Sequence, residues 1–475
     1  MPQSTYNQIL YETVARFAMH PDRMAAVARL FGMHPAPVDG CRYLEIGCGN
    51  GSHIVSLAYH LPQSSFVGVD LAEVPIAAGE KMRTALDLGN LTLRTADLRD
   101  IGQEWGEFDY IAAHGVYSWV PAEVREALLR VCKERLSPNG VVFISYNALP
   151  GAYVRQLLRN LMLFHTRDIQ DSGELLRQAR WSLQFMAASK SLPDAWRPLL
   201  EGDVATMLQL EDGWLFHDDL AEFNHPVYFH EFASHAGRHG LQYLGDAEPP
   251  EMFDPHGQLK QLPGGVIERE QYMDFLKARR FRQTLLCHQS QTLEHRPLEE
   301  CLDRFLFSSY SRTGEDGKLE GLRNVRITAM HDAVRNIAAA LSKVYPRQLT
   351  FADLIPPAGN ESDLRDILTG MLLSGFADFH VYRFPSHQVV SAKPAASRLA
   401  RYQAVHSPRV VNACFHIMEL DETGRQLVHL LDGSRTHRQI AEDLARLPNA
   451  LPLEEIERQL PAHLERLAHA TLLES

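Results

Sequence analysis

The sequence has few cysteines, and they form no recognisable metal or disulfide pattern. Its 475 residues contain six cysteines, with no Cys-x-x-Cys pair among Cys41, Cys48, Cys132, Cys287, Cys301 and Cys414. Scattered thiols of this kind indicate neither a zinc knuckle nor the disulfide framework of a secreted protein. We therefore expect reduced, buried thiols and a cytoplasmic protein.

Long apolar runs and an excess of positive charge are also missing. No stretch approaches the roughly 20 apolar residues that a membrane-spanning helix needs, and no basic segment followed by an apolar core opens the sequence. The 47 Lys and Arg against 59 Asp and Glu give a net charge of −12. This balance disfavours nucleic acid as the main partner. We expect no nucleic-acid partner and no membrane span.

The composition is that of a folded protein with several domains. Hydrophobic residues make up 45% of the chain and charged residues 22%, which excludes disordered and collagen-like proteins. At about 100 to 200 residues per domain, the length predicts two to four domains.

Strands alternate with helices in the first third of the chain. We predict strands at 42–46, 66–70, 91–95, 108–113 and 141–146, helices at 72–86 and 122–136, and a turn at 137–140. Such alternation implies right-handed crossovers and a largely parallel sheet with helices on both faces.

The sheet pattern is interrupted by a helical stretch at 151–219. It then resumes with a helix at 229–239, a strand at 241–244, a helix at 271–281 and a strand at 282–288. We therefore predict an α/β fold with a seven-stranded sheet, in which a helical insertion follows the fifth strand and the last two strands close the sheet.

The remaining segments extend this core at both ends. The apolar residues at 6–33 have the spacing of two short helices. The pattern at 336–392 predicts a winged-helix-like unit with a strand pair at 379–384 and 388–392. Residues 424–473 are mostly helical, with Ser434 as a candidate N-cap. The predicted domains are 1–40 (N-terminal helices), 41–290 (with the insertion at about 151–225), 291–405 (winged-helix-like) and 406–475 (small helical). Without a basic excess, protein docking or autoregulation is a stronger interpretation of the C-terminal region than DNA binding.

A glycine turn between the first strand and the first helix carries the chemistry. Gly47, Gly49 and Gly51 lack a Cβ, so the backbone can approach a ligand closely. Asp70 ends the second strand about 20 residues further on, where an acid can hydrogen-bond ribose hydroxyls. Together they favour a cofactor that contains adenosine.

Glu45, just before the turn, separates the candidate cofactors. A pyrophosphate favours bare N–H groups at the turn and gains nothing from an acid there, whereas S-adenosylmethionine carries a sulfonium and an amino-acid group. The motif from Glu45 to Gly51 resembles motif I of class I S-adenosylmethionine-dependent methyltransferases, which have a Rossmann-like sheet. The resemblance implies S-adenosylmethionine as cofactor, bound by Glu45, Gly47, Cys48, Gly49, Gly51, Asp70, Leu71, Asp97, Leu98 and His114.

Further motifs narrow the resemblance. These motifs lie at 108–121, 144–151, 216–220, 223–229, 271–276 and 281–286. They are similar to bacterial methyltransferases that carry a methyltransferase regulatory domain, including rickettsial protein-lysine methyltransferases of outer-membrane proteins. The match covers about residues 1 to 290, and it departs at His53, where the group has Asn. It implies a protein substrate that is methylated on lysine side chains.

The acceptor site is expected at the carboxyl ends of the fourth and fifth strands, where open α/β sheets bind ligands. The candidate catalytic residues are Tyr117, Trp119, His114, Tyr146 and Asn147. Tyr117 and Trp119 could instead pack under the insertion, His114 could contribute only its backbone, and Asn147 could stabilise a turn.

Several histidines follow the insertion. His217, with Asn224 and Tyr228, fits either a lid over the acceptor or a structural hydrogen-bond cluster. Among His217, His225, His230 and His235, no spacing puts two imidazoles and a carboxylate on one helix face. Methyl transfer needs no metal, so we expect no metal site.

Three functions remain open from the sequence. The first is a protein-lysine N-methyltransferase acting on bacterial outer-membrane or surface proteins. The others are a small-molecule methyltransferase and a regulatory protein that binds the cofactor without turnover. The size of the insertion and the C-terminal region favours a protein substrate, and a homodimer is an open alternative.

Overall fold

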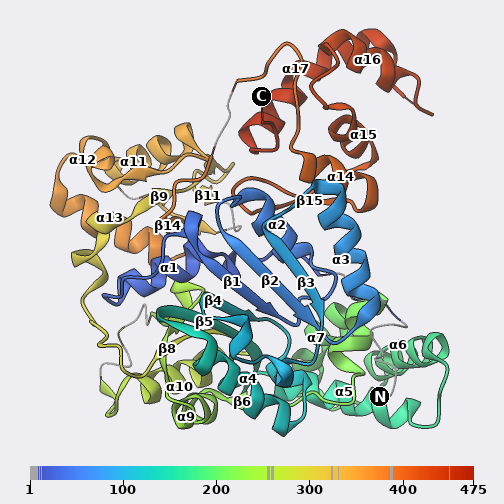
Figure 1. The fold of residues 1–475 in the computed structure, drawn as a ribbon, viewed down its shortest axis with the longest axis vertical. Coiled ribbons are helices and arrows are strands. Elements are labelled where there is room, and N and C mark those ends of the chain that lie inside the picture. The colour runs from blue at the N-terminus through green and yellow to red at the C-terminus, as the bar shows by residue number, and fades with distance from the viewer. Residues whose placement is uncertain are drawn as a thin grey trace.

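The structure is a computed structural model that describes residues 9, 11, 13–253, 257, 261–321, 325–329, 331–385, 389–448 and 450–474. A central sheet is surrounded by helical units (Figure 1). The insertion helices lie at one end of the sheet in this view, the middle of the chain lies beside it, and the C-terminal helices lie at the opposite end.

Seven strands form the main path of the sheet, in the order β3-β2-β1-β4-β5-β8-β7. They are β1 (Arg42–Ile46), β2 (Ser65–Asp70), β3 (Leu91–Thr95), β4 (Phe108–Ala113), β5 (Leu136–Leu149), β7 (Leu241–Asp246) and β8 (Phe281–His288), and β6 (Val227–Tyr228) pairs with the end of β5. Strands β1 to β5 run parallel, and β8 runs antiparallel to β5 and β7. The predicted Rossmann-like sheet and its closure by the last two strands are confirmed.

The alternation of strand residues explains why helices cover both faces. Tyr43 on β1 lies beside Tyr110 on β4, and Leu44 lies beside Ile111; neighbouring positions on a strand point to opposite faces. The two tyrosines pack with α1 (Pro21–Leu30), α2 (Ser52–His60) and α3 (Glu73–Leu86). The two aliphatic residues pack with α4 (Ala122–Arg135) and α9 (Phe229–Arg238).

The insertion between β5 and β6 has a hydrophobic cluster of its own. It consists of α5 (Tyr153–Thr166), α6 (Ser172–Ala188), α7 (Arg197–Gln209), α8 (Asp212–Trp214) and a π-helical turn at Leu215–Asp219. Leu158, Leu183 and Met207 are buried in that cluster. The predicted helical character of this stretch is therefore confirmed.

The bounds of β5 and α10 differ most from the prediction. Strand β5 begins at Leu136 and includes the predicted turn at 137–140. The pairing of β4 with β5 shifts in register between Phe108 and Tyr110, and this irregularity accommodates the additional residues of β5. Helix α10 (Val266–Lys277) starts and ends earlier than predicted, because Phe281 already pairs with Asn147 as the first residue of β8.

The middle of the chain surrounds the short strand β9 (Leu306–Ser308). The other elements are β10 (Ser311–Thr313), β11 (Leu319–Gly321), β12 (Arg326–Ile327), α11 (Asp332–Val344), β13 (Leu349–Thr350), α12 (Phe351–Ala358), α13 (Glu361–Leu373) and β14 (Asp378–His380). The predicted strand pair is wrong: β14 pairs with β9, which buries Phe307 against Phe379, and residues 389–392 form no strand. Gln388 lies outside the described residues.

Helix α1 is bonded to this middle region. The carboxylate of Asp22 accepts the backbone N–H groups of Val381 and Tyr382, each at 2.8 Å, and Arg23 pairs with Asp378 at 2.6 Å. Of the two helices predicted at 6–33, α1 is the second. The first coincides only with a 3-10 turn at Phe17–Met19, and residues 1–8, 10 and 12 lie outside the described part.

The C-terminal region contains α14 (Arg398–His406), a hairpin of β15 (Arg409–Val411) and β16 (Ile417–Glu419), α15 (Glu422–Leu430), α16 (His437–Ala445) and α17 (Leu453–His469). Thr436 rather than Ser434 caps α16, since its side chain accepts the N–H of Gln439. Across the described residues, no helix is long and apolar enough to cross a membrane. All six cysteines are free and buried, as predicted.

Candidate functional site

The glycine turn lies at the carboxyl end of β1, between the neighbouring strands β2 and β4. Gly47, Gly49 and Gly51 have φ values of +75°, +55° and +73°, a region that other residues rarely adopt. A Cβ on Gly47 would lie 2.6 Å from Cγ2 of Val116. The turn thus requires glycine, and it leaves the backbone open to a ligand on its other side.

Asp70 at the end of β2 braces this turn. Its carboxylate accepts the backbone N–H groups of Gly49 and Ala72, each at 2.8 Å. Burial raises the pKa of the Asp70 carboxyl despite these bonds. Asp70 therefore orders the glycine turn while it lines the cavity beside it.

Glu45 is a buried acid without a balancing charge. Its Oε2 atom has no hydrogen-bond partner among the described residues. Burial, with a smaller contribution from Asp70, raises the pKa of Glu45 well above its usual value. A buried carboxylate in this state is costly unless a cation or a donor meets it, so the cavity favours a ligand with a positive group.

These residues surround a cavity of about 560 Å³, within the usual size range for a small-molecule site. Of the predicted cofactor residues, it is lined by Glu45, Gly47, Gly49, Asp70, Leu71, Asp97, Leu98 and His114. Cys48 and Gly51 do not line it: Cys48 is buried behind the turn, and Gly51 is the N-cap of α2. We call this space the cofactor cavity.

Residues from the N-terminal segment also line the cofactor cavity. Tyr11, Thr13 and Arg16 line it, together with His53. The backbone N–H of Arg16 donates to Nδ1 of His53 at 3.2 Å. His53, at a position where the similar methyltransferases have Asn, thus anchors the N-terminal segment beside the cavity.

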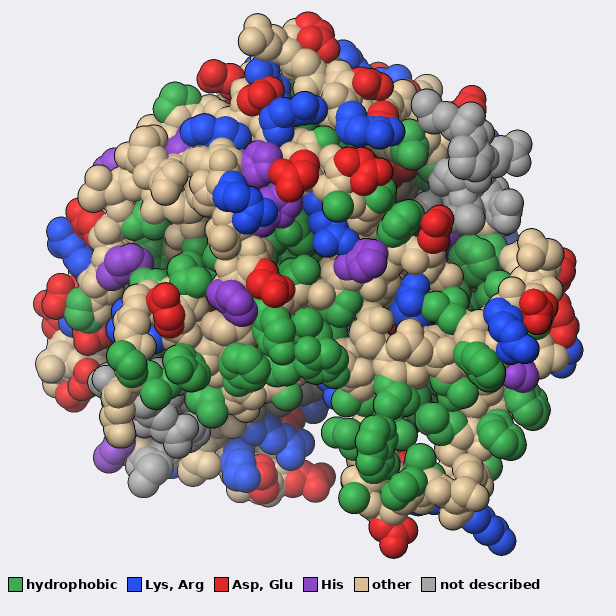
Figure 2. Space-filling view, turned by 90° about the horizontal axis from the view of Figure 1, so that it is seen from below, with side chains coloured by type: hydrophobic (Ala, Val, Ile, Leu, Met, Phe, Trp, Pro, Cys, Tyr) green, Lys and Arg blue, Asp and Glu red, His purple; other side chains and the backbone are tan. Residues whose placement is uncertain are grey.

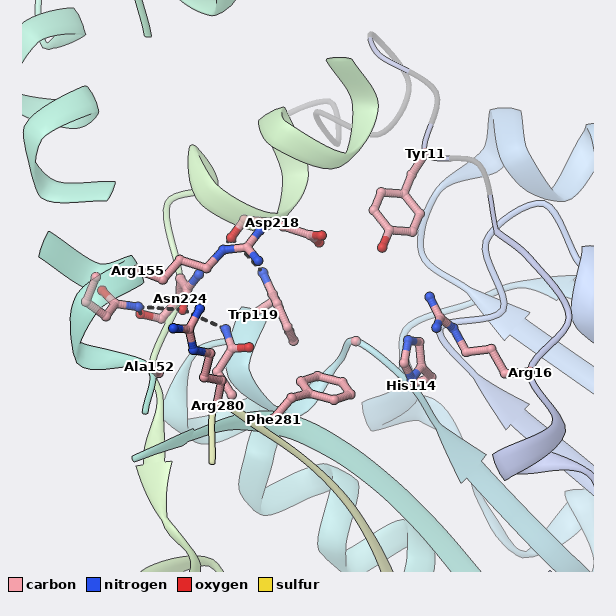
Figure 3. Close-up of a pocket in the computed structure, with 13 residues that line it drawn as sticks. Tyr11, Arg16, His114, Trp119, Ala152, Arg155, Asp218, Asn224, Arg280 and Phe281 are labelled. Carbon is pink, nitrogen blue, oxygen red and sulfur yellow. Dashed lines mark hydrogen bonds between the residues drawn. The ribbon is translucent and has the colours of Figure 1, made fainter. Parts of the chain in front are cut away.

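A second cavity, of about 230 Å³, adjoins the first. The two share Tyr11, Arg16, His114, Gly115, Trp119 and Asp218. The second is completed by residues from α5, β5, β8 and the segment after the insertion, including Arg155, Asn147, Asn224, Arg280 and Phe281 (Figure 3). We call it the acceptor chamber.

Three predicted catalytic residues line the acceptor chamber. The indole N–H of Trp119 donates to the carbonyl oxygen of Asp218 at 3.3 Å, and Asn147 donates to Oδ1 of Asn224 at 3.1 Å. His114 Nδ1 lies 2.9 Å from the Ser145 hydroxyl. Burial lowers the pKa of His114 well below its usual value, so its imidazole is neutral and a weak base.

Tyr117 and Tyr146 do not line either cavity, contrary to the prediction. The Tyr117 hydroxyl lies 2.8 Å from Nδ1 of His235, and the Tyr146 hydroxyl lies 3.0 Å from that of Thr284. Both rings pack against Phe232 of α9. Tyr146 points to the face opposite Asn147 because neighbouring strand residues alternate.

Several chamber residues were missed from the sequence. Asp218 follows the insertion, and burial raises the pKa of its carboxyl to about 6. Arg155 pairs with Asp219 at 2.7 Å, and Arg280 pairs with Asp203. Of the three lid candidates, Asn224 lines the chamber, whereas His217 bonds to the carbonyl oxygen of Ile9 and Tyr228 to Tyr153. The motif at 216–220, which contains Asp218, was the sequence feature that could have indicated these chamber residues.

A Rossmann-like sheet, a glycine turn and an unbalanced acid beside it define an S-adenosylmethionine-dependent methyltransferase of class I. Family models agree: a methyltransferase domain matches residues 44–142, a predicted methyltransferase regulatory domain matches 211–288, and a PKMT C-terminal winged helix domain matches 392–470. The last match lies further along the chain than the winged-helix-like unit predicted at 291–405.

Similar proteins come from Rickettsia. The uncharacterised protein RP789 of Rickettsia prowazekii is 30% identical over 437 residues, which cover 85% of this chain and 78% of that one. RP028 of the same organism is 32% identical over 243 residues, 50% of this chain and 96% of the relative. The structure of PKMT2 from Rickettsia typhi in complex with AdoHcy has a TM-score of 0.83 at 25% identity, covering 98% of this chain and 99% of that one. The chain belongs to the family of methyltransferases that combine this catalytic domain with the regulatory domain.

Proposed function

We propose that the chain transfers a methyl group from S-adenosylmethionine to lysine side chains of proteins, with bacterial outer-membrane or surface proteins as expected substrates. The observation that carries the proposal is the shared wall between the cofactor cavity and the acceptor chamber, where Asp218 and Trp119 lie. The relative of known structure, PKMT2, was solved with AdoHcy, which supports the same cofactor here.

The residues of the cofactor cavity fit S-adenosylmethionine. Glu45 would offer an unbalanced carboxylate to its positive groups, Asp70 would hold the ribose hydroxyls, and Asp97 and Leu98 would lie beside the adenine. Asp97 has a pKa below its usual value because Arg99 bonds to it, so it is ionised. When bound, the cofactor supplies a methyl group that its sulfonium already activates.

The acceptor chamber can prepare a lysine for attack. A lysine ammonium must lose a proton before its nitrogen has a free electron pair. Asp218, with a pKa of about 6, is mostly ionised at neutral pH yet basic enough to take that proton. Arg16 lies in the same wall, and its positive charge disfavours the ammonium form. Trp119 and Phe281 form aromatic walls that tolerate the cation until the proton leaves.

The methyl transfer itself then balances simply. The lysine nitrogen would form the new N–C bond, and the methyl group would leave the cofactor's sulfur, which would keep the electron pair of the broken bond. What the chain contributes is alignment of the nitrogen in the shared wall, removal of one proton and exclusion of water.

Exposed apolar side chains favour a protein as acceptor. Hydrophobic side chains gather on the face of the molecule seen in Figure 2. Trp181, Phe185, Trp196 and Phe275 are 46–61% exposed on the insertion and α10, and Trp181 stacks on Phe185. Clustered exposed apolar side chains are typical of protein-binding surfaces, and a metabolite would not need them.

Labelling would test the proposal. The protein is incubated with S-adenosylmethionine labelled in the methyl group, together with bacterial lysate and purified outer-membrane proteins. We expect label on lysines of polypeptide, identified by mass spectrometry. Label confined to the small-molecule fraction would contradict a protein acceptor, and no transfer at all despite cofactor binding would indicate a regulatory protein.

The remaining sequence expectations stay predictions. We keep the four domains at 1–40, 41–290, 291–405 and 406–475, although the winged-helix match suggests a boundary near residue 392. The free cysteines fit a cytoplasmic location, and a homodimer is still an open alternative.

A further inference from the structure

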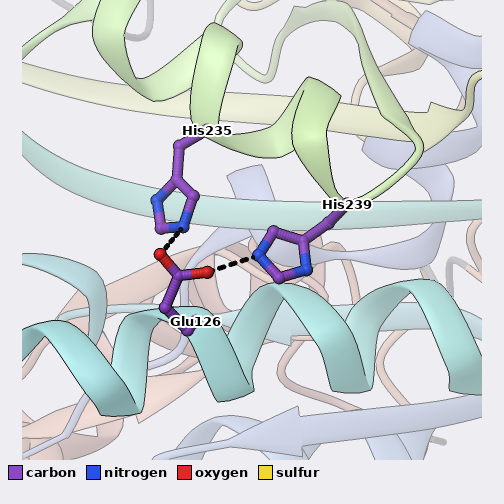
Figure 4. Close-up of side chains that lie close together, drawn as sticks. All are labelled: Glu126, His235 and His239. Atoms are coloured by element: carbon purple, nitrogen blue, oxygen red, sulfur yellow. Dashed lines mark hydrogen bonds and ion pairs between the residues drawn. The ribbon is translucent and has the colours of Figure 1, made fainter.

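A cluster of side chains that could bind a metal lies outside both cavities, between α4 and α9. Glu126 extends from α4, and His235 and His239 lie at the end of α9 (Figure 4). One donor atom from each of the three lies within 4.8 Å of the others. We propose that Glu126, His235 and His239 form a site for a divalent transition metal, with zinc as the natural ion.

The backbone sets up the ligand pair. His235 and His239 are four residues apart, which places two imidazoles on one side of a helical turn, as in helical zinc sites. The carboxylate comes from a different helix, so the ligands converge from two elements. Imidazole nitrogen and carboxylate oxygen are ligands that zinc prefers, and three protein ligands leave a fourth position for water.

The distances suit a small ion. His235 Nε2 lies 3.0 Å from one Glu126 oxygen, and His239 Nε2 lies 2.8 Å from the other. Ligands at about 2.0–2.1 Å around a tetrahedral zinc are roughly 3.4 Å apart. The two contacts between histidine and Glu126 would therefore lengthen by only about half an ångström, and the three ligand atoms already lie within 4.8 Å of one another.

His235 supplies an independent observation. Its side chain is only 10% exposed, and Nε2 has no hydrogen bond of acceptable geometry within the described residues, despite its close contact with Glu126. The nitrogen is thus buried, points at the common centre and is poorly satisfied there. A metal would satisfy it completely.

Tyr117 completes the environment of the site. Its hydroxyl lies 2.8 Å from Nδ1 of His235. A metal-bound imidazole donates its second ring N–H to an acceptor that fixes its orientation, and the Tyr117 oxygen is placed to accept it. This contact gives Tyr117 a positioning role that its place after β4 did not suggest.

The location suggests what the metal does. Glu126 belongs to the segment that matches the methyltransferase domain, and both histidines belong to the segment that matches the regulatory domain. A metal shared by these ligands would fasten the regulatory segment to the catalytic domain through α4 and α9. The site is therefore a clamp between two parts of the chain and takes no part in methyl transfer.

Metal binding by the untagged, chelator-treated full-length protein tests the site. We expect one zinc per chain by calorimetry, a higher melting temperature with zinc, and a visible cobalt spectrum typical of tetrahedral nitrogen and oxygen ligands. Glu126→Gln and His239→Gln should each weaken zinc binding by more than about tenfold, the smallest loss typical even of residues that only support a ligand.

Controls keep the test decisive. Both substitutions change partly exposed side chains, so the variants should fold, and circular dichroism checks this. His469→Gln changes an exposed histidine elsewhere in the chain and should leave zinc affinity unchanged. Equal zinc binding by wild type and both site variants, or no binding by wild type, would overturn the proposal and leave Glu126 in ion-pair contact with the two histidines.

Discussion

The cofactor cavity and the acceptor chamber share a wall but are assembled in different ways. The cofactor cavity is built mostly from turns at the ends of adjacent parallel strands, each close to its own motif in the sequence. The acceptor chamber gathers Tyr11, Arg155, Asp218 and Phe281 from four distant segments. Local backbone geometry thus determines the cofactor, whereas long-range packing determines the acceptor.

The two spaces also differ in how their charges are balanced. Glu45 in the cofactor cavity has an oxygen without a hydrogen-bond partner among the described residues. In the acceptor chamber, Arg155 and Arg280 are paired with Asp219 and Asp203. An unbalanced charge is suited to binding a charged ligand, and paired charges around one acid are suited to moving a proton. Substitutions should therefore separate affinity from turnover.

The largest expected effect comes from Asp218→Asn. If Asp218 takes the acceptor proton, kcat should fall by about 10²- to 10⁴-fold, while the Kd for S-adenosylmethionine stays within about twofold. The measurements are initial rates of methyl transfer and calorimetry. Asp212→Asn, which changes an exposed acid paired with Arg180, is the matched control. Similar losses of rate and cofactor affinity would show that Asp218 only supports the wall.

Glu45→Gln should weaken cofactor binding more than turnover, the opposite of the effect expected for Asp218→Asn. Losing a charged partner should raise the Kd for S-adenosylmethionine by about 10- to 100-fold, with a smaller effect on kcat at saturating cofactor. Glu107→Gln, an exposed acid before β4, is the control. An unchanged Kd would refute the role of Glu45.

The same variant should be more stable than wild type without cofactor. The folded-state pKa of Glu45 is raised, so ionisation opposes folding, and stability is lost as pH rises above the usual carboxyl value of about 4.5. Gln removes this penalty. At pH 7 we expect a gain of about 1 kcal/mol or more, visible as a higher melting temperature, and no gain at pH 4.

The contrast also explains what could be predicted from the sequence. The sheet and the residues Glu45, Gly47, Gly49 and Asp70 were predictable because a strand, a turn and a helix follow one another within a short segment. Tyr117 was misplaced because its distance from β4 does not determine which way the chain turns after Gly115. Its hydroxyl instead contacts His235.

Long-range features escaped prediction for the same physical reason. Asp218 lines the cofactor cavity only because the chain returns to this part of the sheet after the insertion. The histidines weighed as metal ligands from the sequence were His217, His225, His230 and His235, and His239 was not among them. Glu126 lies on a different helix, α4, so the spacing of residues within one helix could not reveal it. Likewise, β14 pairs with β9, about 70 residues away, and not with the next segment.

The pH profile should sharpen the role of the acceptor chamber. Because burial raises the pKa of Asp218 to about 6, the carboxylate form is lost below that value. For wild type, kcat/KM should therefore rise tenfold per pH unit up to about 6 and then level off. Asp218→Asn should keep rising toward the lysine pKa of about 10, because only the neutral amine can react. A wild-type profile without a break near 6 would contradict the assignment.

The smallest expected effects come from the aromatic walls. Phe281 lines only the acceptor chamber, whereas Trp119 lines both spaces. Phe281→Leu should raise KM for the acceptor by about 2- to 10-fold, the range expected for a lost aromatic contact, and should leave the Kd of the cofactor unchanged. Trp119→Leu should weaken the binding of both the acceptor and the cofactor, and Tyr310→Leu, an exposed aromatic residue between β9 and β10, should change neither. If Phe281→Leu weakened cofactor binding as strongly as Trp119→Leu, the two spaces would have to be regarded as a single site.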